Sequence, residues 1–521
     1  MSGMTFAELT PTAFAARAAK VYADRLAVVD REMHYSYAEF WDRAQRLAGL
    51  LADHGVRPGD RVAVIAPNTH VLLEAHHGVP LAGAVLVALN TRLAPAEVAY
   101  ILGHCRARVV IVDASCRDLL DEALRHSMVQ PIVVNCGQPH DEYESQLAGA
   151  ARLAVTVTDE RSLLSINYTS GTTGRPKGVM YHHRGAYLQA LAMAYHARLD
   201  PSSRYLWTLP MFHTNGWCFP WAVTAAGAVH HCLRKVNPAD IWHAIRHDGV
   251  THFCAAPVVL GMLADDPAAT APVPHPVQVF VGGAPPRSAL LARLRALGIE
   301  MRHLYGLTET FGPAVVCEWQ PEWRDLPDER RTALVVRQGI ANVVGEPLRV
   351  VDSAGKDVPA DGATTGEIVL RGNNLMLGYY RDGEATATAV TADGWFRSGD
   401  IGVMHPDGYV ELRDRAKDVI ISGGENIASV EVENTLAEHP AVLDTAVVGA
   451  PHPNWGEVPV AYVTLRPDAA IGEAELVAFV RARIARFKAP HRVIFGELPR
   501  TSTGKIQKAL LRQRAFGIVL E

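Results

Sequence analysis

The chain has 521 residues, of which 49% are hydrophobic and 20% are charged, and its formal net charge at pH 7 is −5. This length exceeds what one hydrophobic core usually organises, so we expect at least two domains. The slightly acidic balance excludes the basic surface that nucleic-acid binding needs, and no nucleic-acid partner is expected. The seven cysteines are scattered without a CxxC pair, which argues against a zinc site and a disulfide framework.

The ends of the sequence and its apolar segments indicate a cytoplasmic protein. Residues 1–25 include Glu8 and Asp24 and have no long apolar run, which makes them a poor secretory signal. The C-terminal sequence Ile-Val-Leu-Glu is not a peroxisomal address. No apolar run reaches the roughly 18 residues that a membrane span needs, so no span is expected.

Helical and strand patterns alternate through the N-terminal part of the chain. A helical periodicity over residues 37–54 is followed by short apolar strands at 61–65 and 109–112. Further apolar strands at 251–255 and 277–281 each run into a turn that contains glycine or proline. Such alternation is typical of layered α/β structure.

The pattern changes between about residue 345 and residue 411. Short strands there, such as 366–372 and 407–412, are separated by Asp-Gly and Gly turns. This spacing predicts an all-β subdomain.

A compact α/β unit of roughly 100 residues follows, which is the usual size of a small domain. Its expected elements are helices at 429–438 and 473–486 and strands near 443–449, 457–465 and 491–496. We therefore expect an N-terminal domain over residues 1–414, a hinge at 415–417 and a mobile C-terminal domain over residues 418–521.

The strongest functional signal is the segment 168–178, which reads Tyr-Thr-Ser-Gly-Thr-Thr-Gly-Arg-Pro-Lys-Gly. Gly171 and Gly174 let backbone N–H groups approach an anion, while the hydroxyls and Lys177 supply further donors. A triphosphate is the ligand that best uses this loop. A proline precedes the lysine and a glycine follows it, so the segment is not a Walker A loop. The residues expected around the phosphates are Thr169, Ser170, Gly171, Thr172, Thr173, Gly174 and Lys177.

This segment resembles the phosphate loop of the adenylate-forming superfamily, which includes acyl-CoA synthetases, luciferases and nonribosomal adenylation domains. Further motifs follow in the family's order over nearly the whole chain. The resemblance implies an α/β fold, with layered α/β subdomains and a β subdomain in the large N-terminal domain. It also implies the use of ATP, Mg²⁺ and coenzyme A. Segments 209–218 and 420–427 are most similar to short- and medium-chain fatty acid–CoA ligases.

The segment 305–310, Tyr-Gly-Leu-Thr-Glu-Thr, is the most specific of the further motifs. An aromatic face can stack on adenine, a hydroxyl can reach the α-phosphate, and a carboxylate can ligate magnesium. The resemblance assigns these roles to Tyr305 with Gly306, to Thr308, and to Glu309. The turn after the strand at 277–281 resembles the family's adenine-binding turn and comprises Gly283, Ala284 and Pro285.

Three motifs near the expected domain boundary complete the nucleotide and thiol sites. Asp400 matches the position that accepts hydrogen bonds from the ribose hydroxyls, a role that suits a carboxylate. By resemblance Arg415 also touches ribose, Lys417 is the hinge residue, and Gly423 and Gly424 border the channel for the pantetheine arm of CoA.

Two predicted residues act on the carboxyl group of the acid. His213 matches the histidine beside the acyl carboxylate, although a packed core histidine is the alternative. Lys505 matches the lysine of a C-terminal loop that assists adenylation. No acidic residue stands where amino-acid-activating relatives keep an aspartate, so amino acids are not expected as substrates. The residues expected to line the acyl pocket are Trp217, Val259, Phe311 and Gly312.

We therefore expect an acid–CoA ligase that forms an acyl-AMP and releases AMP and pyrophosphate. Without a nucleophilic side chain, the catalysis consists of positioning and charge neutralisation. Short- or medium-chain fatty acids are the first expectation, and aryl acids such as benzoate or cinnamate the second. Loading of a carrier protein stays open, as does a homodimer. A non-catalytic binding protein is disfavoured, because every charged residue of the expected machinery is present.

Overall fold

A computed structural model describes residues 5–138, 141–169, 176–282, 288–415, 417–423, 425–501 and 506–516. The contacts within the chain divide it into two units. The first, here called the N-terminal unit, comprises residues 1–348 and 370–396. The second, the C-terminal unit, comprises residues 349–369 and 397–521.

The first sheet of the N-terminal unit orders nine strands, within the described residues, as β15-β14-β13-β12-β11-β9-β10-β1-β2. The strands are β1 (Leu26–Asp30), β2 (Met33–Ser36), β9 (Arg204–Leu206), β10 (Val229–His231), β11 (His252–Ala255), β12 (Val277–Gly282), β13 (Ile299–Leu307), β14 (Gly312–Val316) and β15 (Ile340–Ala341). From β1 to β13 neighbouring strands are parallel, whereas β2, β14 and β15 are antiparallel to their neighbours.

The second sheet orders its described strands as β18-β8-β7-β4-β3-β5-β6. They are β3 (Arg61–Ile65), β4 (Val85–Ala88), β5 (Ala107–Asp113), β6 (Ile132–Cys136), β7 (Leu163–Thr169), β8 (Lys177–His182) and β18 (Gly378–Tyr379). The central strands are parallel and buried along most of their length, as their nearly continuous valines and isoleucines predict.

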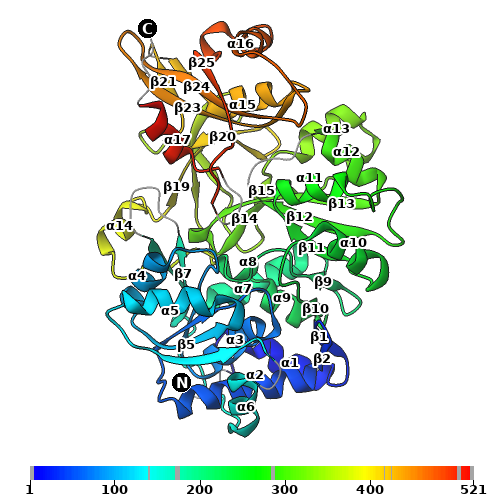
Figure 1. Ribbon diagram of the computed structural model, residues 1–521, viewed down its shortest axis with the longest axis vertical. Helices are drawn as coiled ribbons and strands as arrows, with labels where there is room; N and C mark the ends of the chain where they lie inside the picture. The colour runs from blue at the N-terminus through cyan, green and yellow to red at the C-terminus, as the bar shows by residue number, and fades with distance from the viewer. Residues whose placement is uncertain are drawn as a thin grey trace. The chain divides into compact units, whose positions relative to one another are not determined.

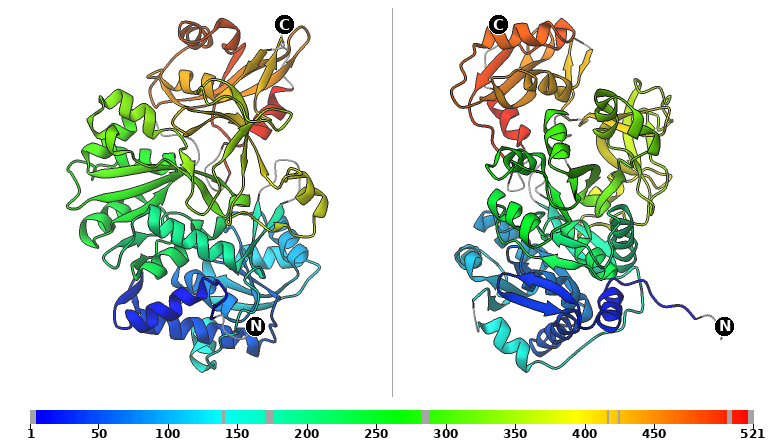
Figure 2. Two further views of the ribbon diagram at one scale, coloured as in Figure 1. Left: turned by 180° about the vertical axis from the view of Figure 1, so that it is seen from behind. Right: turned by 90° about the vertical axis from the view of Figure 1, so that its right-hand side faces the viewer.

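Helices cover both sheets, and Figure 1 shows α10, α11 and α12 along one flank of the nine-stranded sheet. They are α1 (Thr12–Val21), α2 (Tyr37–Asp53), α3 (His70–Leu81), α4 (Pro95–Cys105), α5 (Arg117–Arg125), α6 (Glu142–Gly149), α7 (His183–His196), α8 (Thr214–Trp217), α9 (Phe219–Ala226), α10 (Pro238–His247), α11 (Pro257–Asp265), α12 (Ser288–Ala296), α13 (Asp328–Val335) and α14 (Gly383–Thr388). Short 3-10 turns are η1 (Ala114–Cys116), η2 (Thr308–Thr310) and η3 (Pro321–Asp325). Before α1, the described chain extends away from the body of this unit (Figure 2).

A buried ionic cluster joins α2, α3 and α6 in the N-terminal unit. Arg43 Nε lies 2.5 Å from Glu74 Oε1, and Arg43 Nη2 lies 2.7 Å from Glu144 Oε1. The Tyr143 hydroxyl donates to Glu74 Oε2 at 2.6 Å. Glu74 is fully buried, so these contacts compensate a charge that burial would otherwise make costly.

The C-terminal unit contains two sheets. The first orders β16 (Arg349–Val351), β17 (Thr365–Leu370), β19 (Phe396–Met404) and β20 (Val410–Arg415). The second orders β22 (Glu425–Ile427), β21 (Ile420–Ser422), β24 (Gly456–Leu465) and β23 (Val442–His452), with β25 (Arg492–Phe495) beside β24. Its helices are α15 (Ser429–Ala437), α16 (Glu473–Arg481), η4 (Arg486–Lys488) and α17 (Lys508–Ala515).

The predicted α/β fold class is confirmed, but the predicted all-β subdomain is only partly right. Between β17 and β19 the chain forms helix α14, and β18 pairs with β8 of the seven-stranded sheet. The Gly-Tyr pair of β18 carries no pattern that predicts such a distant partner. None of the helices in the described part of the chain combines the length and apolar character that crossing a bilayer requires.

The predicted boundary at 415–417 stays a prediction. The division by contacts places the sheet of β16, β17, β19 and β20 mainly with the C-terminal residues.

Candidate active site

The candidate site of the N-terminal unit forms where strands of both its sheets end. β7 ends at Thr169 and β8 begins at Lys177, and these two residues pair across the antiparallel strands. They flank the predicted phosphate loop, so the structure places both ends of that loop. The predicted residues within it, Ser170, Gly171, Thr172, Thr173 and Gly174, lie outside the described residues.

Lys177 and Glu309 both contact Tyr379 of β18. The Tyr379 hydroxyl donates to Glu309 Oε1 at 2.8 Å. The Lys177 Nζ lies over the Tyr379 ring, 4.7 Å from its centroid, which is a cation–π contact. Burial and the neighbouring Glu309 carboxylate raise the pKa of Tyr379 well above its usual value, so its hydroxyl remains a donor. One aromatic side chain thus links the predicted phosphate-binding cation to the predicted magnesium carboxylate.

Two hydrogen bonds to its backbone carbonyls hold the turn η2, which carries Thr308 and Glu309. The Tyr181 hydroxyl donates to the Thr308 carbonyl at 2.6 Å, and the Met376 N–H donates to the Glu309 carbonyl at 2.8 Å. Tyr181 comes from β8 of the seven-stranded sheet, whereas η2 follows β13 of the nine-stranded sheet. These bonds therefore join the two sheets at the site.

The turn is tightened further by Thr310, whose buried Oγ1 accepts from the Leu307 N–H at 2.9 Å and donates to the Gly312 carbonyl at 2.6 Å. A Cβ on Gly306 would lie only 2.1 Å from that Gly312 carbonyl oxygen, so only glycine fits there. Tyr305, the predicted adenine platform, is 7% exposed in β13. The adenine-binding turn after β12, with Gly283, Ala284 and Pro285, lies outside the described residues.

Trp217, which is predicted to line the acyl pocket, lies in a run of left-handed backbone from Thr214 to Cys218. The φ angles are 51° at Thr214, 47° at Asn215, 55° at Gly216, 56° at Trp217 and 65° at Cys218. α8 is therefore not an ordinary right-handed helix. Each such residue with a Cβ costs roughly 1–2 kcal/mol, so the surrounding protein must hold the run in place.

Two glycines make room for the Trp217 indole. A Cβ on Gly282, at the end of β12, would lie 2.7 Å from Trp217 Cη2. A Cβ on Gly312 would lie 3.1 Å from Trp217 Cα, and Gly312 itself has a φ of 101°. The indole thus packs between the ends of two strands of the nine-stranded sheet.

Phe311 adjoins this arrangement and is 1% exposed. Its ring stacks on Tyr181 with centroids 3.8 Å apart and meets Trp221 edge-on at 6.1 Å. Tyr181 therefore supports both η2 and the predicted acyl pocket. Val259 lies half-buried on α11 against the hydrophobic cluster of α10 to α12.

His213 immediately precedes the left-handed run and is half-buried. Its backbone N–H donates to the Pro210 carbonyl at 3.0 Å, and its carbonyl accepts from the Gly216 N–H at 3.0 Å. These bonds fix the backbone from which the predicted carboxylate-binding side chain projects.

In the C-terminal unit, the two predicted ribose residues contact each other. Arg415 Nε lies 3.3 Å from Asp400 Oδ1, and the two residues pair across β19 and β20. Partial desolvation and the like charges of Arg415 and Arg512 lower the pKa of Lys417 to about 8. The predicted hinge residue is therefore only partly charged near that pH.

Gly423 occupies the turn between β21 and β22 with a φ of 60°. Its N–H donates to the Trp455 carbonyl at 2.8 Å, and a Cβ there would lie 2.6 Å from Trp455 Cε3. A side chain at this position would displace the indole, which explains the glycine. Gly424 lies outside the described residues.

The predicted adenylation lysine, Lys505, also lies outside the described residues, but both flanks of its loop are placed. Arg500 and Ile506 form an antiparallel bridge, and Arg500 pairs with Asp444. After the loop, Lys508 lies 2.7 Å from Glu433 Oε1. The ends of the loop are thus anchored to β23 and α15.

Comparison with known proteins resolves the family. The AMP-binding enzyme family matches residues 15–380, and the AMP-binding enzyme C-terminal domain family matches residues 431–505. The chain belongs to the AMP-binding enzyme family.

Relatives of this AMP-binding enzyme agree along the whole chain. A protein named as a peroxisomal acetate/butyrate–CoA ligase of Arabidopsis thaliana is 43% identical, over 98% of this chain and 95% of the relative. A protein named as a peroxisomal benzoate–CoA ligase of the same plant is 39% identical, over 98% of this chain and 94% of the relative. The crystal structure of ATP-bound MatB from Rhodopseudomonas palustris has a TM-score of 0.87 and 28% identity, covering 98% of this chain and 99% of that one. The predicted enzyme class, acid–thiol ligase, is confirmed.

The arrangement at Glu309 is compatible with Mg²⁺. Among the described residues, no group of three or more His, Cys, Asp or Glu side chains converges as a metal site. One carboxylate is nevertheless the usual protein contribution where substrate phosphates and water supply the remaining Mg²⁺ ligands. Tyr379 hydrogen-bonds Glu309 Oε1, which orients the carboxylate as outer-sphere partners of metal ligands commonly do.

Sequence reasoning missed three residues of this AMP-binding enzyme's site: Tyr181, Gly282 and Tyr379. Gly282 directly precedes the predicted adenine turn and could have been noticed there. Tyr379 belongs to a two-residue strand with no recognisable motif, and only the pairing of that strand with β8 brings it to the site. Tyr181 follows the predicted phosphate loop closely on β8, but no sequence pattern indicates its contact with the Thr308 carbonyl.

Proposed function

We propose that this AMP-binding enzyme is an ATP-dependent acid–CoA ligase for short-chain carboxylic acids. The observation that carries the proposal is that Lys177 and Glu309 contact the same side chain, Tyr379, beside the end of the predicted phosphate loop. Lys177 lies over its ring, and Glu309 accepts a hydrogen bond from its hydroxyl. The family relationship, the names of its CoA-ligase relatives and the ATP-bound neighbour support the use of ATP and CoA.

In this proposal the residues of the N-terminal unit hold the triphosphate. Lys177 contacts the β- and γ-phosphates together with the hydroxyls of the loop, and Thr308 contacts the α-phosphate. Glu309 would hold Mg²⁺, which when bound neutralises phosphate charge. The substrate carboxylate, oriented beside His213, then attacks the α-phosphorus in line while Lys505 stabilises the charge that builds up. Pyrophosphate leaves, and the acyl-AMP remains.

The second half-reaction requires a thiol beside the acyl-AMP carbonyl. We propose that rotation about Lys417 withdraws Lys505 and presents the Gly423 turn, whose bare backbone borders the pantetheine arm. The thiol gives up its proton to solvent as its sulfur attacks the carbonyl, the bond between the acyl carbon and the phosphate oxygen breaks, and AMP departs with the bonding electron pair to leave the thioester. Hinge motions of this kind are common in enzymes that alternate between two tasks.

The packing of Trp217 supports a short acyl group. Its indole fills the space that Gly282 and Gly312 leave open, and a longer acyl chain would compete with the indole for that space. The relative named for acetate and butyrate agrees with this size.

An aryl acid is the second candidate. The face of Trp217 and the stacked pair of Phe311 and Tyr181 offer aromatic surfaces against which a small ring can pack. The relative named for benzoate supports this alternative.

The proposal extends to the acceptor, the assembly and the location. Free CoA is the proposed acceptor, because the relatives are named as CoA ligases, and carrier-protein loading and a homodimer remain alternatives. The proposed location is the cytoplasm, although the names of the same two relatives include the word peroxisomal.

The deciding experiment measures pyrophosphate release with linear acids of two to twelve carbons, branched acids and aryl acids, each with and without CoA. We expect the largest kcat/KM with acids of two to five carbons and a strong stimulation by CoA. Release that ignores CoA would favour another acceptor. An optimum at eight or more carbons would contradict the short-chain proposal.

Two variants make this experiment specific. Lys505→Ala should abolish acid-dependent release. Trp217→Ala should move the optimum to longer acids, because it vacates the space beside the two glycines. The matched control is Trp319→Ala, which removes an indole that is 39% exposed and should leave the chain-length profile unchanged.

A further inference from the structure

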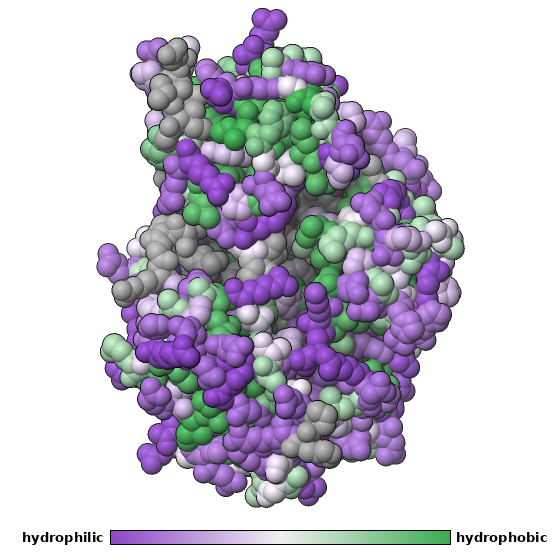
Figure 3. Space-filling view, in the orientation of Figure 1, coloured by the Kyte–Doolittle hydropathy of each residue, from purple (hydrophilic) through white to green (hydrophobic). Residues whose placement is uncertain are grey.

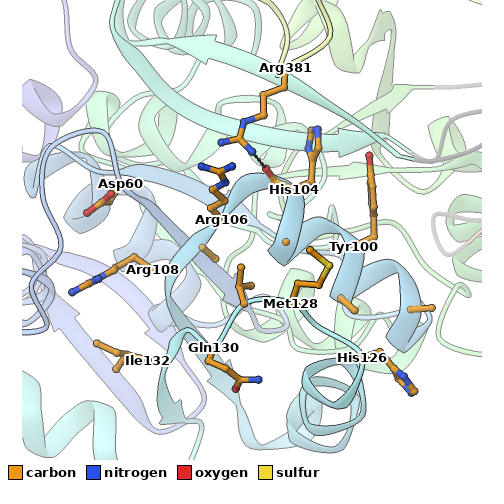
Figure 4. A pocket seen from close by; sticks show the side chains of 15 residues that line it. Asp60, Tyr100, His104, Arg106, Arg108, His126, Met128, Gln130, Ile132 and Arg381 are labelled. Carbon is orange, nitrogen blue, oxygen red and sulfur yellow. Dashed lines mark hydrogen bonds between the residues drawn. The ribbon is translucent and has the colours of Figure 1, made fainter.

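A second pocket opens in the N-terminal unit, and none of the predicted site residues lines it. It is open to solvent and has a volume of about 1090 Å³ between the C-terminal end of α4 and the first residues of β5 and β6. This volume is slightly above the range typical of small-molecule sites, roughly 300–1,000 Å³. The residues that matter here are Tyr100, His104, Arg106, Arg108, Met128 and Arg381 (Figure 4).

The rim of this pocket carries an excess of positive charge. Three arginines line it, against one carboxylate, Asp60, which is itself 3.9 Å from Arg61. Arg106 and Arg108 are exposed, and no described residue forms an ion pair with either guanidinium. Arg381 is held in place because its Nη1 donates to the His104 carbonyl at 3.0 Å. An arginine fork held as that of Arg381 is held suits phosphate oxygens.

Another part of the pocket lining is apolar and partly flat. The Tyr100 ring stacks on His104 with centroids 5.4 Å apart and an interplanar angle of 18°. Met128 is 97% exposed and Ile132 is 36% exposed. Figure 3 shows hydrophilic and hydrophobic residues side by side over α4 and α5. An aromatic ring beside an exposed thioether offers a surface on which a nucleobase can pack.

The wall of the pocket is connected to the phosphate loop. His104 Nδ1 is hydrogen-bonded to the Tyr168 hydroxyl at 2.7 Å, and Tyr168 directly precedes Thr169 at the end of β7. On the other side, Arg381 lies over the Tyr380 ring at 5.1 Å, and Tyr380 follows Tyr379. His104 and Arg381 thus each contact a residue that is next in sequence to a residue of the site, Tyr168 beside Thr169 and Tyr380 beside Tyr379.

We propose that this pocket binds a phosphorylated nucleoside at a site separate from the catalytic one, and that its occupancy is coupled to the phosphate loop. Arg106 and Arg381, which lie at the same end in Figure 4, receive the phosphates, and Arg108, which lies farther along the rim, adds positive charge. Tyr100 and Met128 contact the base. Such a ligand comes either from the adenine nucleotides or from the nucleotide end of CoA.

Equilibrium binding tests the site without turnover, so its outcome is independent of the proposed ligase activity. The catalytic nucleotide site is first saturated with a non-hydrolysable acyl-sulfamoyl adenosine. AMP, adenosine 3′,5′-bisphosphate, CoA and inorganic pyrophosphate are then titrated by calorimetry. We expect one further site per chain for AMP or for the bisphosphate, which identifies the source. CoA, which also enters the pantetheine channel, should show one site more than that channel supplies if the bisphosphate binds.

The double variant Arg106→Ala/Arg108→Ala should weaken this binding at least 10-fold. The matched control, Arg161→Ala/Arg330→Ala, removes two exposed arginines elsewhere in the N-terminal unit and should leave it unchanged. Binding that is equal in the two double variants would overturn the proposal, as would the absence of a further site. Pyrophosphate that binds as tightly as the nucleotides would overturn the assignment of a nucleoside.

Coupling is tested by the KM for ATP in pyrophosphate release. The ligand that calorimetry identifies also acts at the catalytic site, and that effect on the KM for ATP is common to all variants. The change in KM should therefore be several-fold larger in the parent enzyme and in the control than in Arg106→Ala/Arg108→Ala. A change of equal size in all three enzymes, at ligand concentrations that fill the site, would refute the coupling.

Discussion

The cluster around Arg43 and the site around Tyr379 both place charged side chains in the N-terminal unit, but they use them differently. Arg43 is matched by Glu74 and Glu144, at 2.5 Å and 2.7 Å. At the site, the described contacts of Lys177 and of the Glu309 carboxylate are with a neutral tyrosine. Charge matched within the protein stabilises the fold, whereas charge that meets only a neutral partner remains available to a ligand.

Removing one charge of the matched cluster should have the largest effect on stability. Arg43→Met leaves Glu74 buried without its cation, and breaking such a pair typically costs about 3–5 kcal/mol. Urea unfolding should show this loss, while kcat/KM of the folded fraction should stay near the parent value. The control Arg330→Met, on exposed α13, should change stability by less than about 0.5 kcal/mol. A loss in Arg43→Met as small as that of the control would remove the distinction between the clusters.

The same kind of change at the site should leave stability intact and remove activity. Lys177→Met keeps most of the side chain's length but not its charge, and the loss of one well-placed donor typically slows a reaction about 100- to 1000-fold. Pyrophosphate release measures the rate, and urea unfolding should give a free energy within about 0.5 kcal/mol of the parent. A stability loss as large as that of Arg43→Met would show that Lys177 is a structural cation.

Buried histidines with and without acidic partners should affect the pH dependence of stability in opposite ways. Burial lowers the pKa of His76 to about 4 and that of His77 to about 3. Burial would also lower the pKa of His70, but Asp30 and Glu144 raise it to about 9. In the unfolded chain both histidines take up protons below about pH 6.5, whereas in the folded protein His76 and His77 stay neutral until the pH reaches their lowered pKa values. The free energy of unfolding therefore falls between about pH 6.5 and pH 4, by up to about 3 kcal/mol for each histidine. The contribution of His70 has the opposite sign: it is complete below pH 6.5 and is lost as the pH rises through 9.

Unfolding free energies between pH 4 and pH 9 check this prediction. His77→Phe should flatten the acid side of the profile, and His70→Gln should flatten the alkaline side. If both variants kept the slopes of the parent, other groups would govern the pH dependence.

The smallest expected effect concerns the neutral partner at the site. Tyr379→Phe keeps the ring under Lys177 but removes the hydrogen bond to Glu309. A hydrogen bond to a charged acceptor generally contributes about 1.5–3 kcal/mol, and its loss costs less where water can replace the donor. We expect a rise of roughly 5- to 10-fold in the KM for MgATP, with stability unchanged. A double-mutant cycle with Glu309→Gln should show coupling between the two residues, and strictly additive effects would contradict the assigned contact.

Much of the fold was predictable because its strands are continuous apolar runs. The strand predicted at 61–65 is β3 with the same bounds, and the helix predicted over 37–54 is α2, which Ser36 and Glu39 begin with a capping box. The helix predicted over 473–486 instead ends at Arg481, since end signals are weaker than periodicity. β18 escaped prediction because its two residues acquire their partner only through tertiary structure.

For the site, motifs predicted the charged residues but not the residues that hold them. Glu309 and Lys177 belong to segments whose residue types indicate their chemistry, and Gly312 comes shortly after the segment that contains Glu309. Tyr379 and Tyr181 act through contacts with residues far away in the sequence. The left-handed run ending at Cys218 was equally unpredictable, since Gly216 is its only glycine.

The left-handed backbone bears on how the substrate range of this enzyme can evolve. Three of the four residues proposed to line the acyl pocket, Trp217, Phe311 and Gly312, have positive φ angles of 56°, 55° and 101°. A new side chain at any of them must satisfy an unusual backbone as well as a new substrate, and β-branched residues are poorly suited to do so. Val259 lies instead in helix α11, where most side chains are tolerated. Natural variation in acid preference among enzymes of this design should therefore accumulate at the position of Val259, while the other three positions change rarely and together.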